Sequence, residues 1–274
     1  MADFAGSARR GAVAFSVDSL AYVGSGLDEN GVTNDFYSFN PNTNEWASVS
    51  DFPGDARREA VGFTMGGRGY FGTGRGDGGY YRDFWEYYPL TDSWKQLADF
   101  PGTPRMGACG TANFPSAFVM LGEDNSLEYK QDVWEYNYFG NSWSQRADFP
   151  GEPRSQAVAF TVQNRIFCGT GYGGEWYNDF YEYEYFLSDG PELIDLPLQL
   201  YPNPTNGPIT LSFDHPISAF QYKIMDLNGR ILLADNYSGN NTIQLDLSQL
   251  VPSTYFISVL TEDGIQITKQ FVLQ

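Results

Sequence analysis

Hydrophobic and polar residues alternate one by one over short stretches along most of this chain. The segment TIQLDLSQL at 242–250 is one example, and few windows show the three- to four-residue apolar spacing of an amphipathic helix. Alternation with period two places one side of a strand in a core and the other in solvent. Thirty glycines, with clusters of Pro, Asn and Asp, separate these stretches. The pattern predicts an all-β protein of short strands and tight turns.

A corner sequence, DFPG or a close variant, recurs four times with spacings of 48, 48 and 49 residues. An Arg follows each corner Phe by five residues, and a Trp precedes three of them by six residues. A Gly after the second predicted strand and an Asp that opens an aromatic strand keep the same register. Four strands in about 50 residues are typical of one propeller blade. The markers are Phe4, Phe52, Phe100, Phe149; Arg9, Arg57, Arg105, Arg154; Trp46, Trp94, Trp143; Gly26, Gly74, Gly122, Gly171; and Asp35, Asp83, Asp132, Asp179.

The repeats resemble the kelch family of β-propellers. The resemblance rests on the second strands YVGSG, YFGTG and FCGTG, the W-E-Y third strands, the single Trp before the corner and the Arg after it. The third repeat departs from the pattern, since FVMLG replaces its double-glycine strand. The resemblance implies blades at about 2–51, 52–99, 100–148 and 149–186, the last without a tryptophan strand. Residues 187–198, which contain ELIDLP, are expected to be a linker or a degenerate outer strand.

The period ends near residue 199, where turns such as LNGR and EDG separate alternating strands. This predicts a small Ig-like β-sandwich over 199–274. The segment resembles the type A C-terminal sorting domain of the type IX secretion system of Bacteroidetes, through YPNPTNG, IMDLNGR, YFISV and a basic residue before the terminal QFVLQ. By this resemblance the sorting signal includes Pro202, Asn203, Pro204, Gly207, Gly229, Tyr255 and Lys269.

The sorting resemblance implies a route and partners. Such proteins cross the inner membrane by the general secretory path, and the tail directs them through the outer membrane. A sortase often removes the tail, and the cargo is released or attached to surface lipopolysaccharide. The expected partners are therefore the type IX machinery and its sortase, and the expected location is secreted or on the outer-membrane surface.

The first residues, MADF, do not form the signal peptide that this route requires. We therefore expect the chain to be truncated at its N-terminus, with further blades preceding it. The competing interpretation is a complete four-bladed ring.

Composition excludes several classes of function. The net charge is −18 and no basic stripe is present, so nucleic acid is not an expected partner. No apolar run is long enough for a transmembrane helix. Cys109 and Cys168 lie in predicted strands without CxxC spacing, so buried free thiols are expected.

The only histidine, His215, lies in the tail, so a Ser-His-Asp triad cannot form in the repeats. Histidine-ligated copper or zinc is disfavoured for the same reason, and no metal or cofactor is expected. The in-register Asp of each repeat is interpreted as a cap on backbone N–H groups. The acids worth testing for glycosidic chemistry lie in variable loops out of register: Asp28, Glu29, Glu123 and Asp124.

Four arginines begin inner strands next to the predicted channel mouth, where guanidinium groups could bind an anionic ligand bidentately. These candidate ligand-binding residues are Arg9, Arg57, Arg105 and Arg154. The alternative is structural pairing with the corner aspartates Asp3, Asp51, Asp99 and Asp148.

The preferred function is a non-catalytic module that binds an extracellular protein or glycan. The alternatives are a carbohydrate-active kelch enzyme, resembling a sialic-acid epimerase-like isomerase, and a purely structural surface protein. Catalysis is left open and is not the favoured interpretation, because the repeats show mainly in-register charged residues. Fold resemblance alone does not separate these functions.

Overall fold

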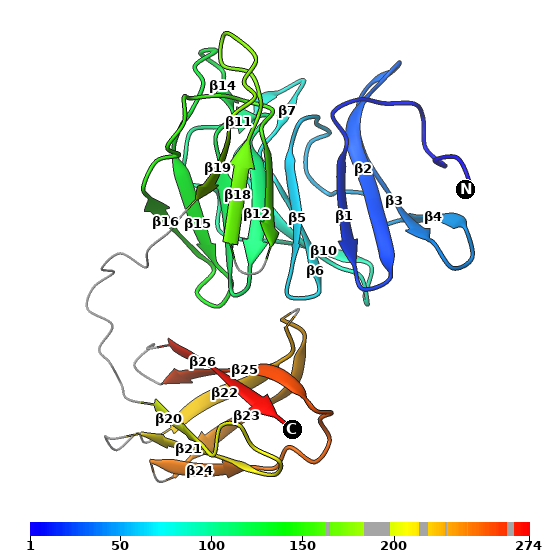
Figure 1. Cartoon of the computed structure of the whole chain (residues 1–274). Helices are drawn as coiled ribbons and strands as arrows, with labels where there is room; N and C mark the ends of the chain where they lie inside the picture. The colour runs from blue at the N-terminus through cyan, green and yellow to red at the C-terminus, as the bar shows by residue number, and fades with distance from the viewer. Residues whose placement is uncertain (163–164, 184–197, 214–218, 228, 240, 262–265) are drawn as a thin grey trace. The chain divides into compact units, whose positions relative to one another are not determined.

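The structure is a computed structural model that describes residues 1–162, 165–183, 198–213, 219–227, 229–239, 241–261 and 266–274. Every regular element among these residues is a β-strand. The chain divides into two compact units, residues 1–185 and 186–274. We refer to them as the repeat region and the C-terminal region, and each is described by itself (Figure 1).

Each of the first three repeats forms a four-stranded antiparallel sheet whose strands follow chain order from the inside outward. The short strands end at turns because Gly, Asp or Asn there adopts a left-handed backbone, as at Gly66 and Gly67 (φ 61° and 70°). The first sheet contains β1 (Val13–Val17), β2 (Leu20–Asp28), β3 (Gly31–Asn40) and β4 (Glu45–Val49); the second contains β5 (Val61–Met65), β6 (Arg68–Gly72), β9 (Phe84–Tyr88) and β10 (Ser93–Gln96); the third contains β12 (Cys109–Asn113), β13 (Ser116–Met120), β15 (Val133–Asn137) and β16 (Ser142–Arg146).

The fourth sheet has three strands in the described part of the chain: β17 (Val158–Val162), β18 (Arg165–Gly169) and β19 (Phe180–Tyr183). The degenerate outer strand or linker expected at 187–198 falls almost wholly outside the described residues. Two small ladders lie outside the main sheets, one in the loop after β6 and the other between the segment before β12 and the loop after β13. They are formed by β7 (Arg75–Gly76) with β8 (Gly79–Tyr80), and by β11 (Arg105–Met106) with β14 (Glu123–Asp124).

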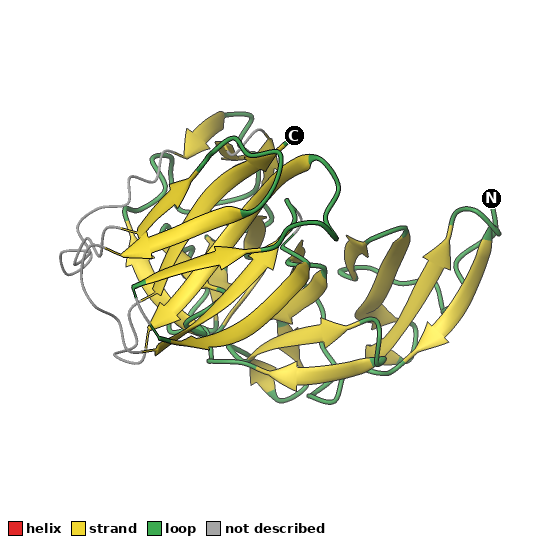
Figure 2. Ribbon diagram, turned by 90° about the horizontal axis from the view of Figure 1, so that it is seen from below, coloured by secondary structure: helices red, strands yellow, loops and turns green. Residues whose placement is uncertain are grey.

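The inner strands of the four sheets lie side by side in the order β1, β5, β12, β17. Figure 2 shows the sheets of the repeat region following one another in an arc, with the N-terminal sheet at one end. No packing of comparable extent joins β17 back to β1 among the described residues, so these four sheets are not closed into a ring. The arrangement is that of propeller blades around part of a circle.

Backbone hydrogen bonds tie each sheet to the next near the start of its inner strand. Gly26 N–H donates to the Arg57 carbonyl at 2.8 Å, and Glu59 N–H donates to the Gly11 carbonyl at 2.8 Å. The same two bonds recur between the second and third sheets and between the third and fourth. They are Gly74 to Arg105 (2.7 Å), Gly107 to Glu59 (2.9 Å), Gly122 to Arg154 (2.8 Å) and Gln156 to Gly107 (2.8 Å).

Aromatic side chains fill the space between neighbouring sheets. Phe15 stacks on Tyr22 with ring centroids 5.4 Å apart, and Tyr87 of the next sheet covers Tyr22 at 5.4 Å. Between the third and fourth sheets, the free thiols Cys109 and Cys168 meet with sulfurs 3.6 Å apart. Burial of both thiols agrees with the expectation from the sequence.

The C-terminal region consists of two antiparallel sheets that share one hydrophobic core. Ile209 and Leu211 from one sheet, and Ile257 and Phe271 from the other, are fully buried in it. One sheet contains β20 (Leu198–Tyr201), β21 (Ile209–Phe213) and β24 (Thr242–Leu245); the other contains β22 (Ala219–Met225), β23 (Ile231–Ser238), β25 (Ser253–Thr261) and β26 (Gln266–Leu273).

Candidate functional site

The four candidate arginines are engaged within the protein. Arg105 donates two hydrogen bonds to Asp132, at 2.5 and 2.8 Å, and further bonds to the carbonyls of Leu121 (2.9 Å) and Thr103 (3.0 Å). Its guanidinium also lies 4.9 Å from the centre of the Phe100 ring. The other three repeats have the same pairing, which is Arg9 with Asp35, Arg57 with Asp83 and Arg154 with Asp179.

The partner of each arginine is therefore the Asp that opens the third strand. The alternative pairing with the corner aspartates is wrong, since Asp3, Asp51, Asp99 and Asp148 are exposed. The side chains of Arg57, Arg105 and Arg154 are no more than 1% exposed. The anion-binding role of these arginines stays a prediction, and the geometry favours a structural role because their donors already have partners.

The arginines also hold the paired aspartates in their charged form. Hydrogen bonds from Arg9 lower the pKa of Asp35, and those from Arg154 lower the pKa of Asp179. Burial alone would raise the pKa of Asp132, but hydrogen bonds from Arg105 keep it below its ordinary value. The interpretation of these aspartates as backbone caps misses this contact.

The four out-of-register acids have different surroundings. Asp28 accepts hydrogen bonds from Ser7 and from the backbone of Asn30, and so closes the β2–β3 turn. Asp124 is buried and bonds to Lys130 at 2.6 Å. Glu29 is exposed at the same turn as Asp28.

Glu123 lies beside other charged groups. Burial and the nearby Glu59 carboxylate raise its pKa, and Arg75 acts in the opposite direction. Glu59 in turn pairs with Arg58 at 3.4 Å. These charges come from two neighbouring repeats and meet where the segment before β5 lies near the loops that follow β6 and β13.

Aromatic residues continue from these charges across the same loops. Arg75 lies 5.3 Å from the Tyr80 ring centre. Tyr129, bridged by backbone to Glu123, contacts Tyr172 with ring centroids 5.9 Å apart. Tyr172 contacts Trp176 at 4.9 Å, and Trp176 is 74% exposed. We call this set the loop surface; it comprises Arg58, Glu59, Arg75, Tyr80, Glu123, Tyr129, Tyr172 and Trp176.

Sequence reasoning missed most of the loop surface because it searched for acids and for in-register residues. The sequence pattern that could have predicted it is the presence of aromatic residues in the loops GDGGYYRD, GEDNSLEYK and GYGGEWYND, at positions that do not recur in every repeat. A search of the described residues for clusters of His, Cys, Asp and Glu that could bind a metal finds none.

The predicted sorting residues lie in two places in the C-terminal region. The PNPT segment is attached to the terminal strand β26: Asn203 bonds to the backbone of Gln270 (3.1 Å) and Val272 (2.9 Å), and Thr205 N–H donates to Val272 (2.8 Å). Pro202 and Pro204 flank Asn203 and are exposed, and a Cβ added at Gly207 would meet no other atom within 4 Å.

The remaining sorting residues lie on other strands and turns. Tyr255 is buried in the core and its hydroxyl donates to the Val251 carbonyl at 2.6 Å. Gly229 has a φ of 76° in the turn after β22, which explains the glycine there. Lys269 is exposed on β26. His215 lies outside the described residues.

Comparison with protein families decides the nature of the C-terminal region. Residues 199–274 match the family model described as a secretion system C-terminal sorting domain. This segment is similar to a sorting domain. A search of curated proteins gives no match.

Comparison with solved structures concerns the fold. The structure of YjhT, a kelch-type propeller, matches with a TM-score of 0.60 and 15% sequence identity over 98% of this chain and 86% of that chain. At this identity the likeness shows a kelch-like fold and nothing about activity. Among the described residues, no helix has the length and apolar character needed to cross a membrane.

Proposed function

We propose that this chain is exported by the type IX secretion system and acts outside the cell as a non-catalytic module that binds a protein or glycan. The observation that carries the export part is the match of residues 199–274 to the sorting domain. The proposed partners are the secretion machinery and its sortase, and the proposed location is secreted or on the cell surface. The export part is tested by where the chain is found with and without residues 199–274.

The loop surface supports the binding part. Trp176, Tyr172 and Tyr129 form a continuous row of aromatic rings in loops, where side chains are free to meet a ligand. Aromatic rings offer a large apolar face at low conformational cost, and the flanking Arg75 and Glu123 can hydrogen-bond to polar ligand groups. The enzymatic alternative has no specific observation in its favour among the described residues.

Binding to glycan and peptide arrays tests this part of the proposal. We expect the wild-type chain to bind a restricted set of ligands, and Trp176→Ala or Tyr172→Ala to weaken binding by about tenfold or more. Leu90→Ala is the matched control, because Leu90 is 99% exposed in the β9–β10 turn and is not part of the loop surface. Wild-type binding that both aromatic variants leave unchanged would exclude the loop surface as the site.

A further inference from the structure

The only two cysteines of the chain face each other across the boundary between the third and fourth sheets. Cys109 is the first residue of β12, and Cys168 lies in β18 opposite Ala159. Their sulfurs are 3.6 Å apart, and the two residues are 6% and 0% exposed. Fifty-nine positions separate them along the chain, so only the packing of the two sheets brings them together.

Apolar side chains occupy the corresponding positions at the other two boundaries between sheets. Positions are compared by counting from the arginine of each repeat. The corresponding pairs are Val13 with Phe71 at the first boundary and Val61 with Val119 at the second. Both pairs belong to the buried cores of their boundaries. The packing at this position therefore does not itself require sulfur.

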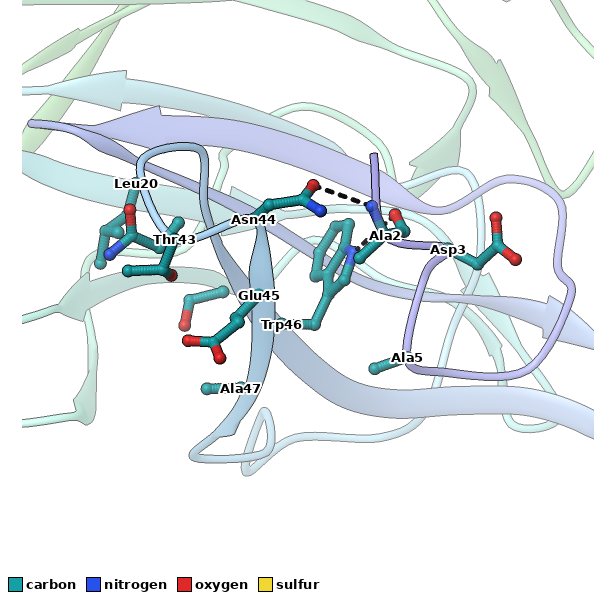
Figure 3. Close-up of a pocket in the computed structure, with 11 residues that line it drawn as sticks. Ala2, Asp3, Ala5, Leu20, Thr43, Asn44, Glu45, Trp46 and Ala47 are labelled. Carbon is teal, nitrogen blue, oxygen red and sulfur yellow. Dashed lines mark hydrogen bonds between the residues drawn. The ribbon is translucent and has the colours of Figure 1, made fainter.

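A second contact between neighbouring repeats uses the tryptophan of the outer strand. Its indole donates to the backbone carbonyl two residues before the corner Phe. Figure 3 shows this contact in the first repeat, where Trp46 donates to the Ala2 carbonyl at 3.4 Å and the Asn44 side chain accepts from Ala2 N–H at 2.8 Å. The same contact recurs from Trp94 to Ser50 (3.0 Å) and from Trp143 to Ala98 (2.9 Å).

The fourth repeat has no tryptophan for this contact, since no Trp follows Trp176 in the sequence. The corresponding carbonyl, that of Ala147, accepts from the Tyr183 hydroxyl at 2.5 Å. The tryptophan contact is thus replaced at the same boundary where the two thiols meet. A covalent bond between the thiols fastens the third sheet to the fourth in another way.

We propose that Cys109 and Cys168 form a disulfide bond when the chain folds outside the cytosol. The proposal rests on the export in the proposed function, because the periplasm and the exterior are oxidising whereas the cytosol keeps thiols reduced. A disulfide has an S–S length of about 2.05 Å, so each sulfur has to move by about 0.8 Å, which small rotations of the two side chains supply. The bond shortens a contact that already exists between the two sheets.

The reaction is a thiol–disulfide exchange with a protein disulfide oxidant of the periplasm. The thiolate of one cysteine attacks the disulfide of the oxidant, which forms a mixed disulfide and releases one oxidant thiolate. The thiolate of the other cysteine then attacks the sulfur of the first and releases the second oxidant thiolate. The two cysteines lose two protons and two electrons, and the oxidant takes them up as it becomes a dithiol.

Burial limits when this reaction can occur. Neither thiol is open to an oxidant in the folded protein. The contact with Cys168, together with burial, raises the pKa of the Cys109 thiol well above its ordinary value. Because the thiolate is the attacking species, the folded reduced protein is expected to react slowly. The pair is therefore oxidised before the fourth sheet packs on the third, and its redox state records the compartment in which the chain folded.

The disulfide lies close to the loop surface. Cys168 precedes Tyr172 by four residues, and Tyr172 contacts Tyr129 of the third repeat across the same boundary. The bond therefore joins the two repeats that supply the aromatic row. A cross-link that closes a loop of this length restricts the unfolded chain, so the oxidised chain should unfold about 5–10 °C higher than the reduced chain.

Refolding of the purified full chain tests the disulfide independently of export. The chain is unfolded in guanidinium chloride with dithiothreitol, freed of the reductant, and refolded in a buffer of reduced and oxidised glutathione. Remaining thiols are alkylated under denaturing conditions and counted by mass spectrometry. We expect no alkylated cysteine and no bound glutathione. The folded reduced chain, given the same buffer without unfolding, should keep both thiols.

The matched control is the double variant Cys109→Val/Cys168→Val, which copies the pair Val61 and Val119 of the second boundary. It should fold and should unfold at the same temperature whether it is refolded with glutathione or with dithiothreitol. Cys109→Ser alone should leave one cysteine that is alkylated or carries glutathione. A refolded wild type in which both cysteines are alkylated or carry glutathione would overturn the proposal.

A comparison of compartments separates this proposal from the export proposal. A secretory signal peptide places the full chain in the periplasm of a bacterium whether or not residues 199–274 direct it further, and without that peptide the chain stays in the cytosol. Acid quenching followed by alkylation preserves the redox state of the thiols. We expect a disulfide in the periplasmic chain and two thiols in the cytosolic chain.

The two proposals fail in different ways. Two free thiols in the folded periplasmic chain would overturn the disulfide, even if the chain then reaches the cell surface. A disulfide in a chain that stays in the periplasm of a strain with a type IX system would support the disulfide and contradict only the export.

Discussion

At the scale of single residues, the most regular feature is the arginine–aspartate pair of each repeat. The sequence shows both residues in register, yet it does not show that they meet, because 25 to 27 residues separate them along the chain. The nearby corner aspartates are the obvious partners in sequence. They point to solvent because the third strand, and not the corner, runs beside the guanidinium.

Replacing Arg105 with Met removes a buried guanidinium and its hydrogen bonds, and leaves the partly buried Asp132 carboxylate without its cation. We expect this to lower the free energy of unfolding of the repeat region by about 3–5 kcal/mol. Urea denaturation followed by tryptophan fluorescence measures it, since all six tryptophans lie before residue 186. Leu90→Ala is the control. A loss below about 1 kcal/mol would contradict the structural role of the pair.

The pairs also predict how stability depends on pH. The pKa values of Asp35 and Asp179 are lower in the folded protein than the ordinary value of about 3.9. The unfolded chain therefore binds more protons as the pH falls, so this stabilisation is complete above the ordinary pKa and is lost as the pH falls through the lowered values. The urea midpoint should drop between pH 7 and pH 3, and it should drop less in Arg154→Met. Equal drops in the two proteins would contradict this.

At the scale of strands and sheets, most of the repeat was predictable. Period-two alternation and the turn residues predict four strands in a repeat, and the structure shows four in each of the first three. The sequence could not show which face of a sheet meets its neighbour, because both faces carry apolar residues. The packing of small residues such as Gly62 under large ones such as Val13 answers that question.

This packing predicts that Gly62→Ala is destabilising, by about 1–3 kcal/mol, because the added Cβ overlaps Val13. Val13→Ala should make room, so the double variant should lose less stability than the two single variants added together. Urea denaturation of the three proteins measures the coupling. Strictly additive losses would show that the two residues do not share one packing site.

At the scale of the whole molecule, the chain joins a kelch-like repeat region to a segment that matches a sorting domain. Both parts could be predicted from the sequence. The repeat region repeats its marker residues about every 48 residues, and the C-terminal region has the short sorting motifs in the expected order along the chain. The loop surface could not be predicted, since its residues come from different repeats and are brought together only by the arc of sheets.

The location of the protein tests the central claim most directly. The full chain, preceded by a secretory signal peptide, is expressed in a bacterium with a type IX system and in the same strain without it. Cell fractions are compared for the wild type, for a chain without residues 199–274, and for Phe271→Asp, which disrupts the core of the C-terminal region. Leu90→Ala is the control for substitution itself.

We predict that the wild type and Leu90→Ala reach the surface or the medium only when the system is present. The shortened chain and Phe271→Asp should stay in the periplasm as stable protein. Export of the shortened chain at the wild-type level, or retention of the wild type in the competent strain, would contradict the assignment of residues 199–274 as the export signal.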